Sequence, residues 1–278
     1  MTATAEDLRK SLRRLAEAGD QPIDLAEAAL LLAALERPAL SPAHYRDRLT
    51  DIARDVAKAF GEGGDGAAPR AAALTEALAV RWRFTGDDRD YEDLDNANLM
   101  RVIDRRRGLP VTLGILFIHA GRAQGWDMTG LGFPGHFLVR LQTGDGERAI
   151  LDPFAGGRAL DVPTMRGLLK AVAGGEAELE PVHYAPISDR EILVRLQNNL
   201  KLRHLRAGAL EPALAAVERI LLFAPEQLAL WREAGMMHLR LGDLNAAVAA
   251  LEQFLARAPN SNARHRVALL VQELRGRT

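Results

Sequence analysis

The sequence predicts an α+β domain followed by an all-α domain of repeated helical hairpins. Three observations support this fold class. The chain up to about residue 125 has the apolar spacing of helices, residues 126–152 contain short runs typical of strands, and the chain from residue 192 repeats itself at an offset of 34 residues. Helices that precede a small antiparallel sheet form the α+β pattern. We therefore expect two domains, residues 1–190 and residues 191–278, which suits 278 residues at roughly 150 per domain.

The composition excludes several classes of protein. Hydrophobic residues make up 48% and charged residues 26%, which are ordinary values for a globular protein. The net charge of −1 does not indicate direct binding to nucleic acid. The longest apolar run, about ten residues from Val111 to Ala120, is half of the roughly 20 that a membrane-spanning helix needs. No apolar leader opens the chain, so we expect a cytoplasmic protein that does not bind a membrane.

The chain contains no cysteine, and this narrows its possible chemistry. Disulfide bonds, thiolate metal sites and a cysteine nucleophile are excluded. The seven histidines are scattered, and His119, on a predicted helix face, has no histidine or carboxylate at ligand spacing. We therefore expect neither a metal ion nor a cofactor.

Capping signals place the first helices. Asp24 followed by Glu27 resembles a capping box, and Ser41 followed by Pro42 supplies an N-cap and a first helical residue. These signals and the apolar spacing predict helices over residues 25–37, 42–60, 70–83, 96–107 and 110–125, with a glycine-rich loop over 61–69 and an acidic stretch over 84–95.

Short runs typical of strands follow the last of these helices. They cover residues 128–132, 136–142 and 148–152, and the glycine-containing residues between the last two are a hairpin signal. Asp161 then caps a predicted helix, and residues 178–184 are a further candidate strand. The region is therefore expected to form a small antiparallel sheet.

The C-terminal third of the chain contains two copies of one pattern. Identical residues recur 34 positions apart, and each copy ends in a proline. The pairs include Leu205 and Leu239, Arg206 and Arg240, Gly208 and Gly242, Ala213 and Ala247, and Pro225 and Pro259. This period is the signature of tetratricopeptide repeats, and Trp231, Gly235 and Phe254 fit that family's pattern. The first copy departs from it, with Gln197 and Lys201 at the tryptophan and glycine positions. We expect about two repeats and a capping helix over residues 260–275.

Four motifs in the first domain lie in a specific order. They are Y-E-D-L-D-N-A-N-L (91–99), V-I-D-R-R-R-G-L-P-V-T-L (102–113), G-F-P-G-H-F-L-V-R (132–140) and L-D-P-F-A-G-G-R (151–158). Their order along the chain resembles the transglutaminase-like fold of the papain-type superfamily: first a helix N-terminus, then a strand with a histidine, then a strand that ends in Asp-Pro. The four motifs together resemble the bacterial SirB family, which joins such a domain to tetratricopeptide repeats. The resemblance extends over about residues 20–275.

The resemblance implies where a catalytic triad would lie. In active transglutaminase-like enzymes a cysteine at the helix N-terminus attacks an amide, a histidine accepts its proton and an aspartate orients the histidine. By position, His136 would be the base, Asp152 the orienting residue, and Thr112 the residue at or beside the nucleophile position. A threonine hydroxyl is a far poorer nucleophile than a thiol, and the alternative is that Thr112 satisfies a backbone group early in its helix. The triad is therefore expected to be a relic, in which His136 holds Asp152.

The predicted hairpin constrains the relic pair. A three-residue loop over residues 144–146 gives paired residue numbers a sum of 290, which places His136 opposite Phe154 and on the same face as Asp152. A two-residue turn gives a sum of 291 and places His136 and Asp152 on opposite faces. The pair therefore requires the odd-length loop or a bulge.

A second candidate site combines arginines with acidic residues. Its members are Arg101, Arg105, Arg106 and Arg107 on one predicted helix and Asp87, Asp88, Asp90, Glu92, Asp93 and Asp95 before it. Two interpretations are open. The cluster is either a local salt-bridged surface or an arginine patch that binds a carboxylate or phosphate.

The repeats carry a third candidate site. Residues 192–278 contain 12 Lys and Arg against 7 Asp and Glu, and the rest of the chain is acidic. The family resemblance places Arg195, Asn198, Asn199 and Arg232 in the repeat groove, where they suit an acidic peptide or a free C-terminus. The alternative is an ordinary solvated face.

These sites predict a function. We expect a non-catalytic pseudoenzyme that binds a protein or peptide partner through its repeats and the relic cleft. Two alternatives stay open: a hydrolase or transferase of peptide amides that uses His136 and Asp152 without a cysteine, and a regulatory protein that acts on gene expression indirectly, as the SirB resemblance implies.

Overall fold

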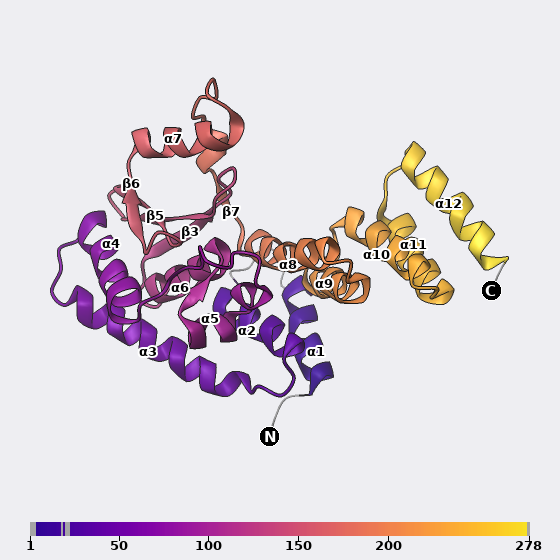
Figure 1. The fold of residues 1–278 in the computed structure, drawn as a ribbon, viewed down its shortest axis with the longest axis horizontal. Coiled ribbons are helices and arrows are strands. Elements are labelled where there is room, and N and C mark those ends of the chain that lie inside the picture. The colour runs from indigo at the N-terminus through magenta and orange to yellow at the C-terminus, as the bar shows by residue number, and fades with distance from the viewer. Residues whose placement is uncertain (1–3, 18, 20–22, 277–278) are drawn as a thin grey trace. The chain divides into compact units, whose positions relative to one another are not determined.

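The computed structural model describes residues 4–17, 19 and 23–276, which divide between two compact units. The sheet unit contains residues 4–8 and 23–196, and the repeat unit contains residues 9–17, 19 and 197–276. The division falls within α8 (Asp189–Arg206), so the domain boundary expected after residue 190 lies in the first turn of that helix. Figure 1 shows the order of the elements.

The sheet unit is organised around a five-stranded antiparallel sheet with the order β6-β5-β4-β3-β7. Its strands are β3 (Asp127–Leu131), β4 (Leu138–Gln142), β5 (Arg148–Asp152), β6 (Arg158–Leu160) and β7 (Pro186–Ile187). A short parallel pair, β1 (Thr85–Gly86) and β2 (Arg107–Gly108), lies apart from it. The predicted α+β class is confirmed.

The β4–β5 hairpin has the three-residue loop. Val139 pairs with Leu151 and Arg140 with Ile150, so paired residue numbers sum to 290. The Thr143 amide donates to the Glu147 carbonyl at 3.0 Å, and Gly146 closes the loop with a φ of 91°. That left-handed conformation favours glycine, which explains the residue at this position.

In the described part of the sheet unit, six α-helices pack on the sheet or on one another, and the predicted caps initiate two of them. Asp24 accepts a hydrogen bond from the Glu27 amide at 3.0 Å, and Ser41 from the Ala43 amide at 3.4 Å. The helices are α2 (Leu25–Glu36), α3 (Pro42–Phe60), α4 (Ala67–Thr75), α5 (Leu99–Arg105), α6 (Pro110–Arg122) and α7 (Val162–Ala173); α1 (Ala5–Glu17) contributes residues to both units.

Three predicted elements differ from the structure. The helix expected over residues 70–83 begins at Ala67, because the Glu147 carboxylate accepts a hydrogen bond from the Ala67 amide at 2.9 Å, and it continues as a π-helix, η1 (Glu76–Arg81). The helix expected over residues 96–107 is a 3₁₀ turn, η2 (Leu94–Ala97), followed by α5. Residues 178–184 do not form a strand: Pro181 opens a 3₁₀ turn, η3 (Pro181–Tyr184), and the strand β7 follows it.

The two faces of the sheet are covered by different helices. On one face, α6 packs closely against β4 and against Phe137, the residue before it. A Cβ at Gly114 would lie 2.3 Å from the Phe137 ring and 3.4 Å from Val139, so only glycine permits this contact. On the other face, α7 contributes Met165 and Leu169 to a buried cluster with Leu138 of β4. The core therefore lies on both sides of the sheet, and α6, buried along most of its length, is its central helix.

The repeat unit consists of helical hairpins. After the end of α8 it contains α9 (Leu210–Phe223), α10 (Leu228–Arg240), α11 (Leu244–Arg257) and α12 (Asn262–Arg275). At Gly235 a Cβ would lie 2.6 Å from Leu251, so the absence of a side chain permits the close contact of α10 with α11. The Trp231 indole donates to the Pro225 carbonyl at 2.8 Å. The predicted tetratricopeptide array with a capping helix is confirmed.

Polar contacts replace the missing tryptophan and glycine of the first repeat. The Lys201 ammonium lies 2.9 Å from the Glu233 carboxylate, and Gln197 accepts a hydrogen bond from Arg219 at 3.3 Å. These contacts attach α8 to α10 and α9 within the repeat unit.

The described residues contain neither a membrane-spanning helix nor a metal-binding cluster. No helix among them is long and apolar enough to cross a membrane. No group of three or more His, Asp or Glu side chains in the described ranges is arranged to hold a metal ion.

Candidate functional site

Thr112 lies in the first turn of α6, where Pro110 opens the helix. Its side chain is fully buried, and its hydroxyl donates to the Asn96 carbonyl at 2.9 Å. The Leu109 amide donates to the same carbonyl at 3.0 Å. The hydroxyl at the nucleophile position therefore satisfies a backbone group and has no access to a substrate.

Asp152, the last residue of β5, accepts hydrogen bonds from the turn that follows it. One carboxylate oxygen accepts hydrogen bonds from the Phe154 amide at 3.0 Å and the Ala155 amide at 3.2 Å. The Asp152 carbonyl accepts a third from Gly157 at 2.8 Å. This buried carboxylate initiates an Asx-type turn, which is a structural use of aspartate.

His136 lies outside the strand that the hairpin register would extend to it. β4 begins two residues later, and His136 is in a turn closed by its amide and the Phe133 carbonyl at 3.1 Å. Its half-buried ring meets the Phe133 ring edge-on at 6.1 Å. Among the described residues no hydrogen bond joins the His136 ring to the Asp152 carboxylate, so Thr112, His136 and Asp152 are not connected as a triad.

Arg195, expected in the repeat groove, belongs to the sheet unit. Its guanidinium donates to the His136 carbonyl at 2.6 Å and lies 5.6 Å from the centre of the Phe137 ring. Burial lowers the pKa of Arg195 from its usual value. This arginine therefore fixes the turn that carries His136.

The other three expected groove residues lie in the repeat unit with different surroundings. Asn199 accepts a hydrogen bond from Arg203 at 3.0 Å. Asn198 is half-buried, and its amide oxygen has no hydrogen-bond partner among the described residues. Arg232 is exposed to solvent.

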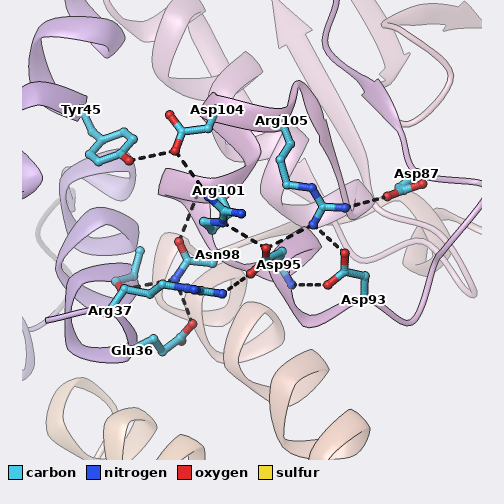
Figure 2. A network of polar contacts seen from close by, with 11 residues as sticks. Glu36, Arg37, Tyr45, Asp87, Asp93, Asp95, Asn98, Arg101, Asp104 and Arg105 are labelled. Carbon is cyan, nitrogen blue, oxygen red and sulfur yellow. Dashed lines mark hydrogen bonds and ion pairs between the residues drawn. The ribbon is translucent and has the colours of Figure 1, made fainter. Parts of the chain in front are cut away.

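The arginine and aspartate cluster forms a network of ion pairs (Figure 2). Arg105 lies 2.6 Å from Asp93 and 3.5 Å from both Asp87 and Asp95. Arg101 lies 3.0 Å from Asp95, which also pairs with Arg37. The salt-bridged interpretation is therefore confirmed for six members of the cluster: Arg101, Arg105, Arg107, Asp87, Asp93 and Asp95.

Residues at the ends of this network have pKa values shifted by burial and by their polar neighbours. Burial opposes ionisation of Asp87, but the Asp90 amide, Asn96 and Arg105 lower the pKa of its carboxyl below the usual value. Burial, together with a 2.9 Å hydrogen bond to Asp104, raises the pKa of Tyr45 to about 12. Arg106 lies apart from the ion pairs: it stacks 4.5 Å from the Trp82 ring and donates to the Trp82 carbonyl at 2.9 Å.

The sheet unit also has an apolar groove away from these sites. It encloses about 900 Å³ between α4, β5, β6 and the start of α7, with Ala71, Ile150 and Met165 among its lining residues. Neither Thr112 nor His136 lines it.

An exposed feature of the repeats was missed by the sequence analysis. Leu202 of α8 and Met236 of α10 are 48% and 43% exposed, and Leu270 of α12 is half-buried. The three residues are 34 positions apart and are called here the apolar row. The repeat period contains this signal when it is applied to the surface of the helices as well as to their core.

Comparisons with known proteins agree with this architecture. Residues 43–198 match the transglutaminase-like superfamily, and residues 200–272 match the tetratricopeptide repeat. UPF0162 proteins of Xylella fastidiosa strain 9a5c and Pseudomonas aeruginosa are each 33% identical to this chain. The aligned regions cover 80% of this chain and 79% of the first relative, and 74% of this chain and of the second.

A more distant relative has a SirB name. Protein SirB1 of Salmonella typhimurium is 27% identical over 156 residues, which cover 56% of this chain and 58% of that protein. The chain therefore belongs to the SirB family of UPF0162 proteins, with a transglutaminase-like domain followed by tetratricopeptide repeats.

Proposed function

We propose that this chain is a non-catalytic adaptor that binds a protein or peptide partner through its repeats. Acyl transfer of the transglutaminase type needs a nucleophile, a base and an orienting carboxylate in mutual hydrogen-bond reach. The observation that carries the proposal is that Thr112 and Asp152 are both engaged by backbone groups. The relic groups therefore stabilise the sheet unit.

The binding half of the proposal is supported by the repeat unit. Tetratricopeptide hairpins expose the surface of their first helices to ligands, and here that surface carries apolar side chains that lie in solvent. A regulatory role of the kind implied by the SirB resemblance would follow from the partner and not from contact with nucleic acid. A hydrolase that uses His136 and Asp152 would need them to be hydrogen-bonded, and no contact among the described residues favours it.

Restoring the missing thiol tests the catalytic half. We expect neither the wild-type chain nor Thr112→Cys to release ammonia from a glutamine-containing peptide in the presence of a primary amine. The wild type lacks a cysteine nucleophile, and a thiol at position 112 would be buried, as the Thr112 hydroxyl is. Amide turnover by the wild type that disappears in His136→Ala would contradict the proposal.

Selection of random peptides tests the binding half. Peptides of 12 residues displayed on phage are selected on the full chain and then counter-selected on Leu202→Asp/Met236→Asp. We expect enriched peptides that bind the wild type and lose binding to the double variant. Val182→Asp is the matched control, because Val182 is 69% exposed in the sheet unit. Failure to enrich any peptide, or equal binding to the double variant, would overturn the proposal.

A further inference from the structure

Each residue of the apolar row has an arginine one helical turn away on at least one side, and Met236 has one on both sides. Arg232 and Arg266 lie four residues before Met236 and Leu270, and Arg206 and Arg240 lie four residues after Leu202 and Met236. Residues four apart are neighbours on one face of a helix, so each row residue shares its face with at least one arginine. All four arginines are exposed.

The helices that carry the row are neighbours within the repeat unit. The ion pair between Lys201 and Glu233 connects α8 to α10 next to Leu202. Leu239 of α10 packs into the same cluster as Val267 and Val271 of α12. Leu202, Met236 and Leu270 therefore lie on successive helices of one array.

Three of the four flanking arginines carry a charge that no described residue pairs. Within the described residues, Arg232, Arg240 and Arg266 have no ion pair or hydrogen bond. No carboxylate occupies the positions four residues before or after the row. Glu218 and Glu252 lie on other helices, α9 and α11. On the helices of the row, Glu233 of α10 is paired with Lys201, and Glu273 of α12 lies three residues after Leu270.

We propose that this face binds an acidic peptide segment whose apolar side chains contact Leu202, Met236 and Leu270 while its carboxylates pair with the flanking arginines. The inference rests on the proposed function and adds the chemistry of the partner. Guanidinium groups suit carboxylates, because they can donate two parallel hydrogen bonds to one carboxylate. No row residue is aromatic, and the six positions four residues before or after the row hold no aromatic residue on which a nucleic-acid base could stack, so a peptide fits better than RNA.

Fluorescence anisotropy of labelled peptides on the full chain tests this. The probe is a 15-residue peptide with leucine at every fourth position and glutamate between the leucines. Its two controls replace every glutamate with glutamine or with lysine. We expect the glutamate peptide to bind at least about tenfold more tightly than the glutamine peptide, and its affinity to fall as NaCl rises from 50 to 300 mM.

Variants assign the effect to the face. Arg232→Glu and Arg240→Glu should each weaken binding of the glutamate peptide about tenfold. Met236→Gln should weaken all peptides that bind. Arg158→Glu is the matched control, because Arg158 is an exposed arginine on β6 in the sheet unit, and it should leave binding unchanged.

The outcomes separate this inference from the proposed function. Binding of the glutamine or lysine peptide but not of the glutamate peptide would overturn the inference and leave the proposed function intact. Binding of no peptide would count against both. Binding of a single-stranded oligouridine as tight as that of the glutamate peptide would overturn the inference in favour of a nucleic-acid ligand.

Discussion

The motif residues Thr112 and Asp152 of the sheet unit and the apolar row of the repeat unit have opposite surroundings. Thr112 and Asp152 are buried and hydrogen-bonded to backbone groups. Met236 and Arg232 lie in solvent, and Arg232 has no partner among the described residues. The motif residues therefore support the fold of the sheet unit, whereas side chains of the apolar row are accessible from solvent.

The largest effect is expected where α6 meets the sheet. A Cβ at Gly114 would lie 2.3 Å from the Phe137 ring, and this central helix has no room to move. We expect Gly114→Val to lower the free energy of unfolding by about 3 kcal/mol, the upper part of the usual range for overpacking. Urea denaturation followed by circular dichroism measures it. Gly144→Val is the control, since a Cβ there would meet nothing within 4 Å.

The next effect tests whether Asp152 is structural. Asp152→Ala removes the acceptor of two backbone hydrogen bonds. A hydrogen bond to a charged group contributes roughly 1.5–3 kcal/mol to stability. We expect a loss of about 2 kcal/mol in unfolding free energy. Asp152→Asn keeps an acceptor oxygen and should lose less than half of that. Equal losses in the two variants would show that the negative charge, and not the turn, is what the fold requires.

The stability of the fold at alkaline pH tests the hydrogen bond of Tyr45 to Asp104 at the end of the ion-pair network. The pKa of Tyr45 is raised to about 12 in the folded chain, above the usual value of about 10 in an unfolded one. Its contribution to stability is therefore fully present below pH 10 and is lost as the pH rises through 12. Between these values the melting temperature of the wild type should fall more steeply than that of Tyr45→Phe. Parallel curves would contradict this assignment.

The smallest effect is expected in the apolar row. Met236→Gln changes a side chain that is 43% exposed, so the free energy of unfolding should change by less than about 0.5 kcal/mol. The comparison of the two regions depends on this result, because peptide binding must be lost without loss of stability. A large drop in the melting temperature would show that Met236 is part of the core.

Much of the fold could be predicted from the sequence because it depends on periodic or local signals. The 34-residue offset identified the repeats. The hairpin signal located the turn between β4 and β5 but left two registers open, of which the structure has the one with the three-residue loop over residues 144–146. The extent of α4 could not be predicted, because its first amide is capped by Glu147, which is 80 residues distant in sequence. The π-helix after it likewise has no simple sequence signal.

The candidate site was less accessible to sequence reasoning. The motifs located Thr112, His136 and Asp152 by analogy with enzymes, but their hydrogen bonds depend on the path of the backbone around Asn96 and Phe154. Arg195 follows the repeat register and yet donates to His136, because α8 begins in the sheet unit. Register along a helix does not show which unit a residue packs against.

The distribution of the three tryptophans makes the two units optically separable. Trp82, stacked under Arg106, and Trp126, edge-on to Phe60, belong to the sheet unit, and Trp231 is in the repeat unit. A chain with Trp82→Phe and Trp126→Phe would emit only from the repeats, where the indole is bonded to the Pro225 carbonyl. Fluorescence during chemical denaturation would then report whether the repeat array melts in one step with the sheet or ahead of it.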